Sequence, residues 1–118
     1  MATDTHEREI RIGRNQALFR EVNERVETLR NSSYPLTEID FICECADDTC
    51  FEPLTLTITE YEAVREHPDR FAVHPEHVYP EAETVAERLD AYWIVEKRGA
   101  ARQVVVAAEK RGSAAKQA

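Results

Sequence analysis

All three cysteines of this 118-residue chain lie within eight residues, in the spacing C-x-C-x4-C. They are Cys43, Cys45 and Cys50. Proteins bind structural zinc with four ligands arranged as a tetrahedron, and thiolate sulfur is one of the ligands that zinc prefers. Three sulfurs on one short segment therefore predict most of a zinc site. The fourth ligand must come from another part of the chain.

The segment between the last two cysteines favours a turn. Residues 46–49 include two aspartates and a threonine, whose side chains bond to their own backbone in turns. We expect a strand that ends at Cys43, a turn before Cys45 so that both sulfurs reach one ion, and a return strand from Glu52. The same cysteine spacing resembles the post-SET motif, in which three cysteines bind zinc with a fourth ligand from elsewhere. That resemblance covers these eight residues only.

A histidine is the natural fourth ligand, and the chain has four. His6 lies in an N-terminus that is expected to fray. His67 precedes Pro68 at an expected helix end, where a histidine can cap carbonyl groups. His74 and His77 lie where an expected strand runs into a loop. We favour His77 as the ligand, with His74 as the alternative.

Other roles for the cysteines are weaker. Cysteine can be a small buried apolar residue with a free thiol, and two cysteines can form a disulfide. Three of them flanked by acids and interrupted by a polar turn fit an apolar core poorly. Secreted disulfide frameworks usually have even numbers of cysteines. The odd number, with no signal sequence in the chain, predicts a reducing, cytoplasmic location.

The charges are divided unevenly along the chain. Residues 38–96 carry sixteen acids and three bases, whereas residues 97–118 carry six bases and one acid. The acidic body disfavours nucleic-acid binding, which depends on neutralising phosphates. The basic C-terminal segment could still contact nucleic acid or an acidic partner. No apolar run reaches the length of a membrane span, so a membrane location is not expected.

The first periodic segment is an amphipathic helix over residues 9–30. Gly13 weakens its first turns, so the firm part is expected to begin near Arg14, and residues 1–7 are expected to be disordered. Two pairs of opposite charges are expected on its outer faces: Arg20 with Glu24, and Glu21 with Arg25. One apolar stripe is expected to pack on the domain's own core, with a partner helix as the alternative: Leu18, Phe19, Val22, Val26 and Leu29.

The rest of the chain predicts a small, mainly antiparallel sheet and two short helices. The expected strands cover residues 39–43, 54–58, 70–74 and 92–95. Residues 104–106 are expected to form a further strand, with part of a terminal helix as the alternative. The expected helices cover residues 60–66, with Thr59 as N-cap and Glu62 at the capping-box position, and residues 80–89, with Pro80 in the first turn. We therefore predict an α+β fold, with one zinc-stabilised domain over residues 1–98 and a basic extension over residues 99–118.

The motifs of common enzyme classes are missing from the sequence. The three glycines, Gly13, Gly99 and Gly112, are too far apart in the sequence to form a glycine-rich phosphate-binding loop. Neither H-E-x-x-H nor G-x-S-x-G occurs. A nucleophilic pair of Cys50 and His77 is conceivable, but nearby acids would raise the pKa of the thiol, which opposes catalysis. A closed set of three cysteines and one histidine also leaves no position for zinc-bound water. The sequence therefore predicts a protein that is not an enzyme.

Several stretches together resemble a group of small actinobacterial proteins with no assigned activity. The matching stretches are residues 14–25, Cys43-Glu44-Cys45-Ala46 with Cys50, residues 61–65 through Pro68 to Arg70-Phe71, and residues 95–97. Members of the group carry Pro-Gly-His where this chain has Pro75-Glu76-His77. The resemblance spans about residues 10–98. It supports His77 over His74 and implies no function.

Three functional hypotheses follow from these features. The first is a protein-interaction or regulatory module with a structural zinc site bound by Cys43, Cys45, Cys50 and His77. The second is a redox sensor in which oxidation of the cysteines releases zinc. The third is a nucleic-acid-associated protein that uses the basic C-terminal segment. The first requires buried, inert thiolates, whereas the second requires an exposed, reactive one.

Overall fold

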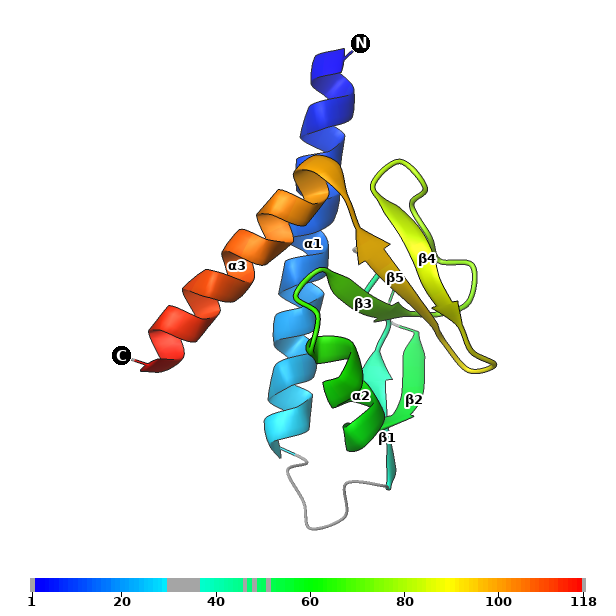
Figure 1. The fold of residues 1–118 in the computed structure, drawn as a ribbon. Helices are drawn as coiled ribbons and strands as arrows, with labels where there is room; N and C mark the ends of the chain where they lie inside the picture. Colours follow the sequence, from blue (N-terminus) through cyan, green and yellow to red (C-terminus); the bar gives the residue numbers. More distant parts are fainter. Residues whose placement is uncertain (1, 30–36, 46, 48, 51, 118) are drawn as a thin grey trace.

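A long N-terminal helix, α1 (Ala2–Leu29), runs along the molecule, and the other elements are arranged against it (Figure 1). The computed structural model describes residues 2–29, 37–45, 47, 49–50 and 52–117. In chain order the remaining elements are β1 (Glu38–Ile42), β2 (Pro53–Thr57), α2 (Ile58–Arg65), β3 (Arg70–Val73), β4 (Glu83–Arg88), β5 (Trp93–Lys97) and α3 (Gly99–Gln117). The fold is a single α+β domain, as the sequence predicts.

The strands form two small antiparallel sheets. In the first, β1 pairs with β2 so that Phe41 lies opposite Leu54. In the second, β5 lies between β3 and β4. The two sheets are joined where the N–H of Glu44 donates to the carbonyl of Ala72 at 2.9 Å. This junction lies inside the cysteine segment, so the candidate site is fixed to both sheets.

The apolar core fills the space between the sheets, α1 and α2. The aromatic rings of Phe41 and Tyr61 stack with their centroids 4.4 Å apart. Each fully buried aliphatic or aromatic side chain stabilises the fold by about 1.5–3 kcal/mol. Other large apolar side chains that are fully or almost fully buried include Leu54, Leu56, Val64, Phe71, Val73, Val95 and Val105.

The predicted apolar stripe of α1 is mostly wrong. Phe19 is buried and Val26 packs against the core, but Leu18 is 57% exposed, Val22 40% and Leu29 85%. The face that α1 turns inward carries three buried polar side chains, those of Gln16, Arg20 and Asn23. The cause is the surface it meets, because strand ends and edges present backbone groups that require hydrogen-bond partners.

Arg20 is one of these buried polar residues of α1, although the sequence predicts it to be exposed. It was expected on an outer face, but its guanidinium is buried, stacks 3.8 Å from the ring centroid of Phe71, and donates to the carbonyls of Pro68 and Arg70. The other expected surface pair, Glu21 with Arg25, is present at 3.9 Å and is exposed. Arg20 therefore fastens α1 to the start of β3.

Several predicted boundaries and element types differ from the structure. Residues 2–7 are helical, and α2 begins two residues early because the capping box is formed by Thr57 and Glu60. Residues 83–88 form strand β4 and not a helix, because they pair along the edge of β5. Residues 104–106 lie in helix α3, not in a strand.

Helix α3 crosses α1 at a glycine (Figure 1). A Cβ at Gly13 would lie 3.0 Å from the carbonyl oxygen of Ala101, so a larger residue here would require the two helices to move apart slightly. Ala101 and Val105 are buried at the crossing. Farther along, Arg65 of α2 binds Glu24 of α1, and also binds a carboxylate of α3 at 3.0 Å. Besides the crossing at Gly13, Arg65 thus links all three helices through ion pairs.

A buried ion pair holds the loop that precedes β4. Glu83 and Lys97 face each other across β4 and β5, and both side chains are fully buried. Glu83 also accepts a hydrogen bond from the Gln16 amide at 3.2 Å and from the N–H of Tyr79 at 2.8 Å. Burial lowers the pKa of Lys97, and the Glu83 carboxylate opposes that shift. The pair therefore connects α1 with the loop that contains His77.

Removing the cation of this pair should destabilise the protein strongly. Lys97→Met leaves the Glu83 carboxylate buried without its counter-ion, and we expect the free energy of unfolding to fall by about 3–5 kcal/mol in urea titrations. The double variant Lys97→Met/Glu83→Gln is the control, because it removes both charges. It should recover most of the loss, and equal losses in the single and double variants would contradict the prediction.

Candidate metal centre

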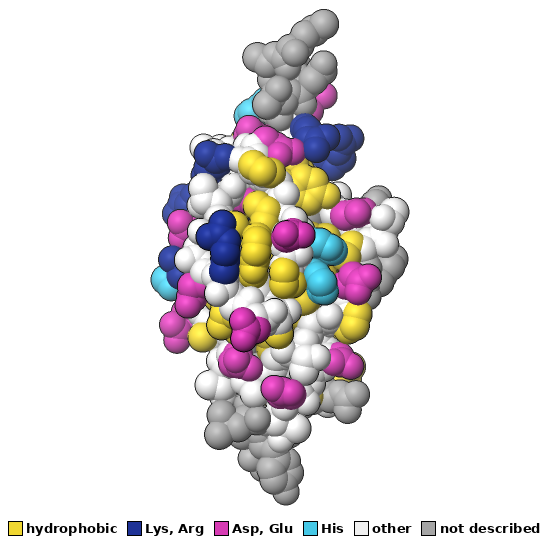
Figure 2. Space-filling view, turned by 90° about the vertical axis from the view of Figure 1, so that its right-hand side faces the viewer, with side chains coloured by type: hydrophobic (Ala, Val, Ile, Leu, Met, Phe, Trp, Pro, Cys, Tyr) yellow, Lys and Arg dark blue, Asp and Glu magenta, His cyan; other side chains and the backbone are white. Residues whose placement is uncertain are grey.

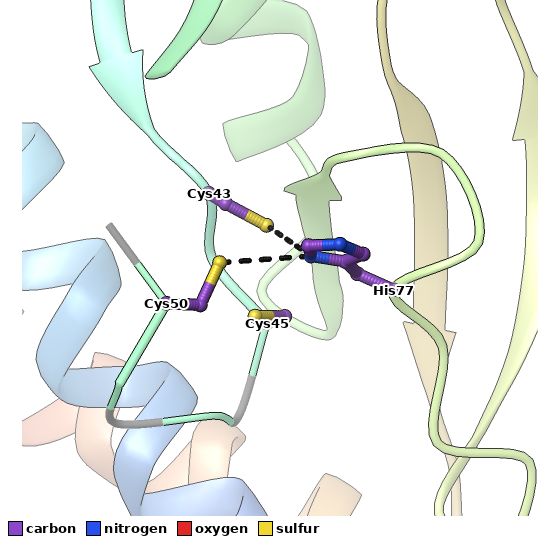
Figure 3. Close-up of side chains that lie close together, drawn as sticks. All are labelled: Cys43, Cys45, Cys50 and His77. Carbon is purple, nitrogen blue, oxygen red and sulfur yellow. Dashed lines mark hydrogen bonds between the residues drawn. The ribbon is translucent and has the colours of Figure 1, made fainter. Parts of the chain in front are cut away.

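The side chains of Cys43, Cys45, Cys50 and His77 converge on one point (Figure 3). Their sulfur and nitrogen atoms all lie within 4.8 Å of one another. The Nδ1 atom of His77 is 3.6 Å from the Sγ of Cys43 and 3.6 Å from the Sγ of Cys50. A tetrahedral zinc, with bonds of about 2.3 Å to sulfur and about 2.0–2.1 Å to nitrogen, holds such atoms about 3.6 Å apart. The spacing therefore fits a shared metal ion.

The β1–β2 hairpin places the first two sulfurs. Its ladder continues beyond β1, because the N–H of Cys43 donates to the carbonyl of Glu52 at 2.8 Å. Side chains two residues apart lie on the same side of an extended segment, so Cys43 and Cys45 face the same point while Glu44 faces away. The turn expected between these two cysteines is therefore not needed, and the chain bends only at Cys45.

The turn itself lies at the end of the hairpin, as predicted. The N–H of Cys50 donates to the carbonyl of Asp47 at 3.0 Å. The Asp47 carboxylate accepts from the backbone of Thr49 at 2.9 Å and from its hydroxyl at 2.6 Å, and these two bonds lower the pKa of Asp47. This local network returns Cys50 toward the other two sulfurs. Ala46 and Asp48 of the predicted turn lie outside the described residues.

The loop after β3 brings His77 to the cysteines. The N–H of His77 donates to the carbonyl of His74 at 3.0 Å, which closes a tight turn. Glu76 inside this turn has φ of 72°, a conformation that favours glycine. Here a glutamate adopts this left-handed backbone conformation, inside the turn that positions His77.

Each of the four histidines now has a position. His77 belongs to the cluster, whereas His74 contributes its backbone N–H, which donates to the Sγ of Cys43 at 3.1 Å. The rings of His74 and His77 are 5.0 Å apart. His67 lies just beyond α2, where its N–H donates to Val64, and His6 lies in α1. Neither belongs to the cluster.

The electrostatics of the three thiols favour a bound cation. Cys43 and Cys45 are fully buried and Cys50 is 9% exposed. The neighbouring Cys45 sulfur and burial raise the pKa of Cys43, and burial raises that of Cys50. A hydrogen bond from Cys43 lowers the pKa of Cys45 to about 5. Without a cation the cluster therefore holds one thiolate, since further negative charge would be buried and unpaired.

Backbone N–H groups further stabilise thiolate sulfur at this site. Cys43 is approached by the N–H groups of Cys45 and His74, and each of these contacts lowers its pKa. The N–H of Asp47 does the same for Cys45, and the N–H of Glu52 does so for Cys50. All three sulfurs thus receive an N–H from the residue two positions later. Such donors partly offset the negative charge of a metal–thiolate cluster.

Glu44 is the important residue that the sequence analysis missed. It was grouped with the acids that flank the cysteines, but its side chain is fully buried. The spacing of the cysteines could have revealed it. Side chains alternate between the two faces of an extended segment, so the middle residue of C-x-C faces away from the sulfurs and into the body of the protein.

Comparisons of the chain with protein-family models, with curated proteins and with solved structures found no match. Within the part of the chain that the structure describes, no helix is both long and apolar enough to cross a membrane. Function must therefore be inferred from the geometry of the four clustered side chains.

Zinc uptake should release fewer protons than there are cysteines. Because the pKa of Cys45 is about 5 and those of Cys43 and Cys50 are raised, we expect about two protons per zinc at about pH 8. Affinity should rise with pH until the last two thiols ionise. Below about pH 5 it should fall more steeply, because Cys45 is then protonated as well.

Calorimetric titration of the metal-free protein in buffers of different ionisation enthalpy measures this number. Release of three protons by the unaltered protein would show that Cys45 is not ionised in advance.

Proposed function

We propose that the chain binds one Zn²⁺ through Cys43, Cys45, Cys50 and His77, and that it acts as a non-enzymatic interaction or regulatory module built around this structural ion. The observation that carries the proposal is the convergence of four donor atoms at zinc-like spacing, with His77 Nδ1 equidistant from two sulfurs. Three sulfurs and one imidazole are a ligand set typical of structural zinc.

The closed ligand set supports a structural ion over a catalytic one. Catalytic zinc retains an open position for water or substrate, whereas four protein ligands fill a tetrahedron. The two sulfurs of Cys43 and Cys45 are fully buried, which also limits access by substrates and oxidants. These features favour a scaffold over both an enzyme and a thiol sensor.

The surface supports an interaction role with another protein. Three large apolar side chains of α1 are exposed: Leu18, Val22 and Leu29. Exposed apolar side chains gathered on one element are a common feature of protein contact surfaces. Acidic side chains are scattered over the face of the molecule shown in Figure 2, and residues 38–96 carry sixteen acids against three bases, which disfavours nucleic acid as the partner.

Metal analysis and ligand variants test the zinc site. Protein purified without chelators should contain about one zinc per chain. Cys45→Ser should abolish binding and lower the melting temperature, because the stabilisation that the bound ion contributes would be lost. His77→Ala should weaken zinc binding by more than about 100-fold, beyond the effect of residues that merely orient ligands.

Two histidine variants serve as matched controls. His67→Ala and His74→Ala should leave zinc affinity within a few-fold of the unaltered protein, because neither ring belongs to the cluster. A purified protein with no metal and three freely titrating thiols would refute the zinc site. Loss of zinc in His74→Ala but not in His77→Ala would refute the ligand assignment alone.

A further inference from the structure

We propose that Asn23 and Glu44 are positioning residues that hold the C-x-C segment in its ligand geometry before the metal binds. Helix α1 is then a functional part of the metal site and not only its support. This inference rests on the proposed zinc binding and adds to it residues that touch no metal.

Asn23 pairs with the backbone immediately before the first cysteine. Its Nδ2 donates to the carbonyl of Ile42 at 2.9 Å, and its Oδ1 accepts from the N–H of Ile42 at 2.9 Å. The side-chain amide thus imitates a neighbouring strand on the outer edge of β1. Asn23 is fully buried, so these bonds do not compete with water.

Every polar group of Glu44, in its backbone and in its side chain, makes a hydrogen bond. One carboxylate oxygen accepts from the Tyr61 hydroxyl at 2.7 Å and from Asn23 Nδ2 at 3.0 Å. The other accepts from the N–H of Ala72 at 3.0 Å, and the N–H of Glu44 donates to the carbonyl of Ala72 at 2.9 Å. Its own carbonyl accepts from the Gln16 amide at 3.0 Å. α1, α2 and β3 therefore all fix this one residue.

The alternation of the strand converts these contacts into ligand geometry. Ile42 and Glu44 bind the body of the protein, so Cys43 and Cys45 between and beyond them must project to the opposite side. These bonds fix the direction of the Cα–Cβ bond of both cysteines, because turning the backbone so that either points elsewhere would break bonds made by Asn23 or Glu44. The two ligands are therefore ordered in advance, and metal binding loses less free energy to ordering the chain.

Asn23→Ala tests the role of the helix directly. It should weaken zinc binding by about 10–100-fold, as is typical for residues that orient metal ligands. The affinity is measured by competition with a chromophoric chelator. Replacing zinc with Co²⁺ gives a second readout, because loss of tetrahedral geometry reduces the intensity of the cobalt absorption bands. A purely structural role would not alter that spectrum.

Tyr61→Phe is the milder variant and is decisive if Asn23→Ala does not fold. It removes one donor to Glu44 and retains the ring that stacks on Phe41. We expect a smaller loss of zinc affinity, up to about 10-fold, in a folded protein. Val105→Ala is the matched control, because it opens a cavity under α3, which packs on α1 and β5, and destabilises the fold without removing a hydrogen bond to the hairpin.

The inference is supported if Asn23→Ala and Tyr61→Phe lose affinity while Val105→Ala retains it. It is refuted if both positioning variants bind zinc like the unaltered protein, or if Val105→Ala loses as much affinity as they do. In that case the unaltered protein still binds zinc and His77→Ala still loses it, so the proposed function survives. If the unaltered protein binds no zinc, both proposals fail.

Discussion

A carboxylate taken out of water is strongly destabilising unless its oxygens are all hydrogen-bonded, and the buried carboxylate of Glu44 imposes this requirement on the whole fold. Its donors come from α1, α2 and β3, in the form of Asn23, Tyr61 and the N–H of Ala72. Three elements distant in sequence must be in place together to satisfy it. Glu44 lies between two cysteines. The hydrogen bonds that fix it in the core therefore also set the spacing of two candidate metal ligands.

The polar inner face of α1 follows from the same requirement. A helix beside a sheet usually buries an apolar stripe. Here Gln16, Arg20 and Asn23 are turned inward, where they donate to carbonyls of the cysteine segment and of the chain entering β3. Leu18 and Leu29 consequently point outward, into solvent. The exposed apolar side chains of α1 are therefore a result of how the helix serves the site.

The local features could be predicted from the sequence, and the long-range ones could not. The grouping of three cysteines with His77 and the first three strands are present in the structure, as are the turn contacts among Asp47, Thr49 and Cys50. The strands and the turn contacts depend on residues close together in the sequence. The buried face of α1 depends on backbone groups of other elements. Residues 83–88 became a strand because β5 offered an open edge, which overrode the helical signals after Pro80. Residues 104–106 became helical because α3 packs against α1, which outweighs the strand preference of valine.

The metal and the buried network would stabilise different parts of the molecule. Glu44 and its partners fix Cys43 and the core, whereas Cys50 and His77 lie on a turn and a loop held mainly by short-range hydrogen bonds. The loop also contains Glu76 in a left-handed conformation, which costs about 1 kcal/mol or more. A bound ion would join the end of the β1–β2 hairpin to this loop, which follows β3 of the other sheet. Its contribution would therefore be to fix the surface around the site, while the core persists on its own hydrogen bonds and apolar packing.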